Sequence, residues 1–170
     1  MTIKAIVKNL AMALAAIAVM TPVAAEAHHS FAMYDMTKSY ALTGVLVRSN
    51  PDAFHYQMFI AQLDAERKAI VRDQAGEPVI WVIELAGAAE MASKGITANS
   101  FTPGAIVSVG YHPLRNGSPG GAGLDLGLYK CPEKTPPAPG KFCDSVNGGQ
   151  SFLGEFPPGT EEGHVAVAAN

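Results

Sequence analysis

Histidine is the residue type in this sequence best suited to chemistry. The chain has five histidines, and four of them stand at distinctive places. His28 and His29 follow an apolar N-terminal segment, His55 begins an alternating apolar segment, and His112 ends another. Neutral imidazole is the commonest metal ligand among protein side chains. We therefore take these four histidines as candidate metal ligands.

The first 27 residues have the layout of a secretory signal peptide. Lys4 and Lys8 supply a positive start, residues 10–20 are almost wholly apolar, and Ala25-Glu26-Ala27 offers small residues at the positions that a signal peptidase reads. The alternative is an anchored transmembrane helix, but the apolar run is shorter than the roughly 20 residues that span a bilayer. We expect a signal-peptide helix over residues 1–27 and a periplasmic or secreted mature protein that does not span the membrane.

Cleavage of that segment would create a metal-binding terminus. A cut after Ala27 makes His28 the first residue, so that its α-amino group, whose pKa is about 8 in model peptides, and its imidazole could chelate one ion. A cut after Ala25 instead places His28 third, which is also a tight Cu(II) chelate. Several nitrogen ligands in tetragonal geometry suit Cu(II), so copper is the expected cofactor. The alternative is that His28 and His29 are only a polar start and that His112 makes a structural hydrogen bond.

Other site chemistries have weaker support in the sequence. It contains neither a Gly-x-Ser-x-Gly nor a His-Glu-x-x-His motif, and we expect no enzyme activity. The formal charge of −3 argues against a nucleic-acid-binding protein. The Gly-rich segment 115–123 is interpreted as a hairpin turn and not as a phosphate loop. Arg115 is a candidate anion ligand beside its backbone N–H groups.

Cys131 and Cys143 are the only two cysteines, and they bracket a Pro-rich segment. An even count in an oxidising compartment predicts a disulfide. Closing this short loop would stabilise the fold by about 3 kcal/mol in the chain-entropy model. The alternative, a metal-binding pair, lacks a second cysteine pair or an adjacent histidine.

Alternating apolar segments predict the elements that must position these residues. A short helix over 88–94 is expected between the third and fourth of five strands, at residues 40–50, 55–63, 79–85, 105–112 and 124–130. This order is that of a small five-stranded OB-like barrel, mostly β, with an open sheet carrying one helix as the alternative. We assign the barrel to residues 28–130 and a Pro/Gly-rich tail to 131–170.

An ordered set of motifs carries a resemblance to a known family. The motifs are "HHSFAMYD" (28–35), "LTGVLVRSNP" (42–51), "SKGI" (93–96) and "FTPGAIVSVGYHPLRNGSPGG" (101–121). Over residues 28–130 the chain resembles DUF6152, a family of small exported bacterial proteins of unknown function. The resemblance implies a compact β-barrel domain and supplies no reaction.

The resemblance also bears on the histidines. The family's His-His-Ser start corresponds to residues 28–30 and its His-Pro pair to His112-Pro113. Its Asn-Pro-His triplet is Asn50-Pro51-Asp52 here, so His55 is displaced by three residues. Residues 64–78 and the Cys-containing tail also depart from the pattern.

We therefore predict an exported binding or accessory module with a copper-type site built from His28, His29, His112 and His55. The alternative is a metal-free interaction domain that binds a periplasmic partner through a barrel face and the Pro-rich tail. A copper-dependent redox enzyme is the third reading, and it has the least support because the sequence identifies no substrate cleft.

Overall fold

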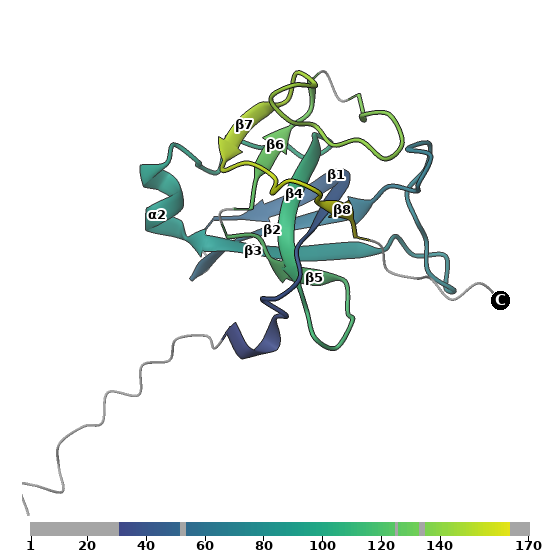
Figure 1. The fold of residues 1–170 in the computed structure, drawn as a ribbon, viewed down its shortest axis with the longest axis horizontal. Helices are drawn as coiled ribbons and strands as arrows, with labels where there is room; N and C mark the ends of the chain where they lie inside the picture. The colour runs from purple at the N-terminus through teal and green to yellow at the C-terminus, as the bar shows by residue number, and fades with distance from the viewer. Residues whose placement is uncertain (1–30, 52–53, 125, 133–134, 164–170) are drawn as a thin grey trace, which may run out of the picture. The chain divides into compact units, whose positions relative to one another are not determined.

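The computed structural model describes residues 31–51, 54–124, 126–132 and 135–163. The expected signal-peptide helix lies outside these residues. The described part is mostly β, with eight strands in one sheet and one short α-helix (Figure 1). The elements are η1 (Phe31–Met33), β1 (Tyr40–Asn50), β2 (His55–Gln62), β3 (Ile80–Gly87), α2 (Ala88–Ser93), β4 (Ile106–Pro113), β5 (Gly120–Ala122), β6 (Leu128–Lys130), β7 (Gln150–Leu153) and β8 (Glu161–Glu162). Within the described residues, no helix has the length and apolar character needed to cross a membrane.

Five of the strands pair in a closed circuit, in the order β1–β2–β3–β5–β4 and back to β1. Within this circuit, β1 pairs with two strands, since its first half pairs with β4 and its second half pairs with β2. A bulge between Leu46 and Arg48 accompanies the change of partner, and bulges bend strands. Gly44 lies where the two pairings overlap, and a Cβ there would collide with the carbonyl oxygen of Ala61. Glycine therefore permits the close approach of the strands at this crossing.

The inner faces of the strands form the main core. On β3 the side chains alternate, so that Trp81, Ile83 and Leu85 are buried while Glu84 is only partly covered. This period of two is what places one face of a strand against a core. The short helix α2 adds the fully buried Met91. It ends before Gly95, whose φ of +80° is the left-handed conformation common for a glycine after a helix.

The structure corrects the expected fifth strand. Residues 115–123 are more than a hairpin turn, because Gly120–Ala122 forms β5 and pairs in parallel with β3. Of the expected strand 124–130, Leu128–Lys130 forms β6. A Cβ on Gly121 would lie 2.5 Å from the carbonyl oxygen of His112. Glycine is needed at this pairing. Because glycine has no side chain, the sequence of β5 lacks the alternation of apolar and polar side chains by which a strand is predicted.

The segment after Cys131, expected to be a tail, contributes two strands to the sheet. β7 pairs with β6, and β8 pairs in parallel with the start of β1. The prediction of a mostly β fold with one short helix between the third and fourth strands is confirmed. The sheet, however, has eight strands where we expected five.

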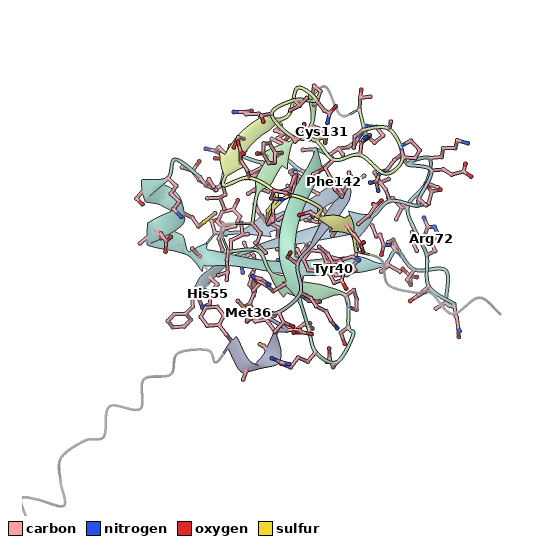
Figure 2. The ribbon with its side chains drawn as sticks, viewed as in Figure 1. Met36, Tyr40, His55, Arg72, Cys131 and Phe142 are labelled. Carbon is pink, nitrogen blue, oxygen red and sulfur yellow. A yellow bond between two sulfur atoms is a disulfide. The ribbon has the colours of Figure 1, made fainter. Side chains whose placement is uncertain are left out.

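Cys131 and Cys143 lie at disulfide distance, as predicted, with their Cα atoms 5.3 Å apart. Both are buried in a second apolar cluster with Leu63, Ile106 and Tyr129. The backbone N–H of Cys143 donates to Ser108 Oγ on β4 at 3.0 Å. The disulfide therefore fastens the Pro-rich segment to the sheet, near Phe142, which is labelled with Cys131 in Figure 2.

Candidate functional site

The segment that follows His28 and His29 is fixed to the end of β4. The backbone N–H of Asp35 donates to Pro113 O at 2.8 Å, and that of Arg115 donates to Met33 O at 2.9 Å. Tyr34 forms an isolated antiparallel bridge with Leu114. We call residues 31–38 together with residues 112–115 the N-terminal clamp. The clamp fixes the chain from Phe31 onward, and Phe31 follows His29 by two residues in the sequence.

His112 is oriented by this clamp. Its Nδ1 lies 2.7 Å from the carbonyl oxygen of Lys38. A carbonyl oxygen can only accept a hydrogen bond, so Nδ1 carries the proton. In the neutral imidazole the lone pair is then on Nε2. Metal-ligating histidines have this arrangement, with one ring nitrogen donating to a backbone carbonyl and the other on the ion.

Asp35 holds the turn that presents the Lys38 carbonyl. Its Oδ1 accepts hydrogen bonds from the Thr37 hydroxyl at 2.6 Å and from the Thr37 backbone N–H at 3.2 Å. Lys38 Nζ lies 3.3 Å from the other carboxylate oxygen. The Thr37 hydroxyl, followed by the Thr37 N–H and Lys38, lowers the pKa of the Asp35 carboxyl. The ionised form is therefore the one that the turn stabilises.

A polar cluster joins the clamp to the middle of the sheet. The Tyr34 hydroxyl donates to Glu84 Oε2 at 2.8 Å, and Gln57 Nε2 donates to Glu84 Oε1 at 3.3 Å. Burial, then the hydrogen bond to Glu84 and its charge, raise the pKa of Tyr34 far above its usual range. The hydroxyl therefore stays protonated and remains a donor.

Strand register relates this cluster to His112. Gln57 pairs with Glu84, Glu84 with Ala122, and Ala122 with His112 across β2, β3, β5 and β4. Directly paired residues present their side chains on the same face of a sheet. Gln57, Glu84 and His112 therefore share one face, which the clamp partly covers.

His55, the fourth candidate ligand, begins β2 opposite Gly87 and is labelled in Figure 2. Around the circuit of strands, β3 and β5 separate β2 from β4 on one side and β1 separates them on the other, and neighbouring strands lie about 4.8 Å apart. His55 and His112 thus occupy separate strands of the sheet. Among the residues that the structure describes, no group of three or more His, Cys, Asp or Glu side chains is placed to hold a metal ion. His28 and His29 lie outside them.

Arg115, the candidate anion ligand, makes contacts within the chain. Its Nε donates to Ala32 O at 3.0 Å, which adds a bond to the clamp. The backbone N–H groups of Arg115, Gly117 and Ser118 donate to Met33 O, Leu114 O and Asn116 Oδ1. These bonds use three of the loop's backbone N–H groups, and the anion-binding role of Arg115 stays a prediction.

Sequence reasoning missed Tyr34 and Glu84. Glu84 was detectable in principle because it is the one charged residue in the apolar segment "VIWVIEL". A lone carboxylate on a largely apolar strand needs a hydrogen-bond partner. Its partner Tyr34 is 50 residues away, so the pair required the fold.

Comparison with known proteins places the chain in a family. A family model for DUF6152, described as a family of unknown function, matches residues 15–123. The chain belongs to this family. The DUF6152 match includes the clamp, β1 to β5 and α2, and ends before both cysteines. No curated protein and no solved structure matches the chain.

Proposed function

We propose that this DUF6152 protein is an exported binding module that holds a copper-type metal ion at its processed N-terminus, with His112 as the fixed ligand. One observation carries the proposal: the N-terminal clamp orients the His112 imidazole with Nδ1 donating to the Lys38 carbonyl. This bond leaves the Nε2 lone pair free to bind an ion, as the backbone hydrogen bonds to metal-bound histidines do.

Chain length supports the participation of the terminal histidines. His29 precedes Phe31 by two residues, and a residue spans at most about 3.6 Å. On this ground of sequence proximity we propose the imidazole of His29 as a further ligand. Together with the new α-amino group and the imidazoles of His28 and His112, it would supply the nitrogen donors that Cu(II) prefers. When bound, the ion would be the cargo or cofactor of the module.

Two further features support export and the domain plan. An apolar N-terminal segment with an Ala-x-Ala site and a disulfide-distance cysteine pair both fit a compartment outside the cytoplasm. The closed circuit of five strands with α2 between β3 and β4 supports an OB-like barrel for residues 28–130. Residues 131–170 would form an extension that supplies β7 and β8.

The test is Cu(II) titration calorimetry on the mature protein beginning at His28. We expect an additional N-terminal Met-Gly to weaken binding at least tenfold, because it removes the free α-amino group next to His28. His112→Ala should also weaken binding, whereas the matched variant His55→Ala should not. Equal, weak binding by all four proteins would refute the site.

A metal-free partner-binding role is the second candidate. It is favoured by exposed apolar side chains in and near the clamp, among them Phe31, Met33 and Met36. The two roles are distinguished by the same titration. If the mature protein binds copper no better than the protein with the added Met-Gly, the exposed apolar surface of the clamp becomes the better-supported functional site.

A further inference from the structure

A cavity of about 370 Å³ opens where the start of β1 meets the β4–β5 connection. Three aromatic residues on three strands line it, Tyr40 on β1, Trp81 on β3 and Tyr111 on β4. Ser118 and Glu162 add polar groups to the lining. The volume lies in the range of small-molecule sites. Figure 2 labels Tyr40 at this end of the sheet.

The three rings form a continuous aromatic wall. The Trp81 and Tyr111 ring centroids are 5.0 Å apart in an edge-on arrangement, and those of Tyr40 and Tyr111 are 6.1 Å apart. The Trp81 Nε1–H donates to Gln62 Oε1 at 2.8 Å. Because this bond uses the polar edge of the indole, the ring carbons are what Trp81 contributes to the cavity.

Glu162 is the one carboxylate among the residues that line the cavity, and none of these lining residues is cationic. Glu162 forms an ion pair with Arg67, but the side chain of Arg67 is only 2% exposed and does not line the cavity. The guanidinium therefore holds the carboxylate in place from behind the wall.

Tyr111 remains neutral beside this carboxylate. Burial, followed by electrostatic interaction with Tyr40 and with Glu162, raises the pKa of the Tyr111 hydroxyl far above its usual range. Gly163 approaches the same hydroxyl so closely that a Cβ there would collide with it. The Gly163 N–H is bound to Ala41 O at 2.9 Å, so the backbone after β8 is a fixed part of the wall.

We propose that this cavity binds a small organic cation, a protonated amine or a quaternary ammonium group. Aromatic rings attract cations through their quadrupoles, and the attraction increases when the cation is desolvated. The Glu162 carboxylate adds charge complementarity and would repel an anion. His112 is not among the residues that line the cavity, so this inference does not depend on the proposed metal site.

The chain offers a direct readout, because Trp81 is its only tryptophan. Choline would be titrated against Trp81 fluorescence in the presence of a metal chelator. The controls are two ligands of the same shape, the neutral 3,3-dimethylbutan-1-ol and the anionic 3,3-dimethylbutanoate. We expect saturable binding of choline, and binding of the alcohol weaker by about tenfold, as cation–π and charge terms of ordinary size imply. The anion should bind least.

Matched variants locate the site. Tyr40→Leu should weaken choline binding by about three- to tenfold, whereas Tyr40→Phe keeps the ring and should bind as the parent does. Ser118→Lys places a positive charge at the exposed rim and should weaken choline binding. Ala92→Lys, on α2, adds the same charge elsewhere and should not. Circular dichroism confirms that each variant is folded.

Three outcomes would overturn the proposal. The first is a Trp81 signal that does not saturate with choline. The second is equal affinity for choline and the alcohol, which would indicate an apolar pocket without charge preference. The third is equal choline binding by Ser118→Lys and Ala92→Lys, which would place the cation elsewhere.

Discussion

Replacing Tyr34 with phenylalanine removes one oxygen and tests how the N-terminal clamp is held. Tyr34 as a whole residue is only 6% exposed, so a phenyl group can keep the same packing. The lost interaction is the 2.8 Å hydrogen bond from the hydroxyl to Glu84 Oε2. Hydrogen bonds to charged groups contribute about 1.5–3 kcal/mol. Since Glu84 is partly accessible to water, we expect a loss of about 1–2 kcal/mol.

The loss should appear in the clamp and not throughout the sheet. The amides of Asp35 and Arg115 donate within the clamp, to Pro113 O and Met33 O. A loss of 1–2 kcal/mol corresponds to roughly 5- to 30-fold faster exchange of these amides with solvent deuterium. Exchange of the buried amides of β3 should change much less. Native-state hydrogen exchange followed by NMR measures both.

A matched substitution separates this effect from the general cost of a lost tyrosine hydroxyl. The Tyr129 hydroxyl donates to Gly154 O at 3.2 Å, in the second apolar cluster. Tyr129→Phe should leave exchange at Asp35 and Arg115 unchanged. The reasoning is refuted if Tyr34→Phe leaves those two amides protected, or if it accelerates exchange equally in the clamp and in β3.

Three other perturbations have expected outcomes. Replacing Cys131 and Cys143 together with serine should lower the free energy of unfolding by about 3 kcal/mol in urea denaturation; an unchanged midpoint would contradict the role of the cross-link. Gly121→Ala introduces a Cβ 2.5 Å from a carbonyl oxygen on β4, so we expect about 1–3 kcal/mol of destabilisation by thermal unfolding; an unaltered Tm would show that β5 is not held as described. Because the folded-state pKa of Asp35 is below its reference value of 3.8, its carboxylate stabilises the clamp above that pH and the contribution disappears as the pH falls through the folded-state value. Protection of clamp amides should therefore decline in acid, and Asp35→Asn should remove that part of the pH dependence; an identical acid profile in the variant would sink this assignment.

The side-chain patterns predicted the strands that have one buried face. "VIWVIEL" alternates strongly, and β3 begins within one residue of the expected position. β5 escaped prediction because two of its three residues are glycines and carry no pattern. β7 and β8 are short, and their pairing with β6 and β1 depends on strands that are already in place. No local periodicity encodes such pairings.

The sequence indicated which residue types could form the candidate metal site, but it did not indicate their arrangement in space. His112 was identified from its place at the end of an alternating segment, but its orientation depends on Lys38 O, 74 residues away. The four-histidine set joined residues by type alone and stays a prediction, with His55 on β2 and His112 on β4. Glu162 in the aromatic cavity comes from a segment expected to be a tail.

The two-residue strand β8 has a consequence for association between molecules. At Tyr40 and Ala41 one edge of β1 is paired with β4, and β8 covers the other edge. An uncovered strand edge presents free N–H and C=O groups to which a second chain can add. β8 therefore protects this edge of β1, and a chain that lacks Glu161 and Glu162 would expose the edge to pairing with a second molecule.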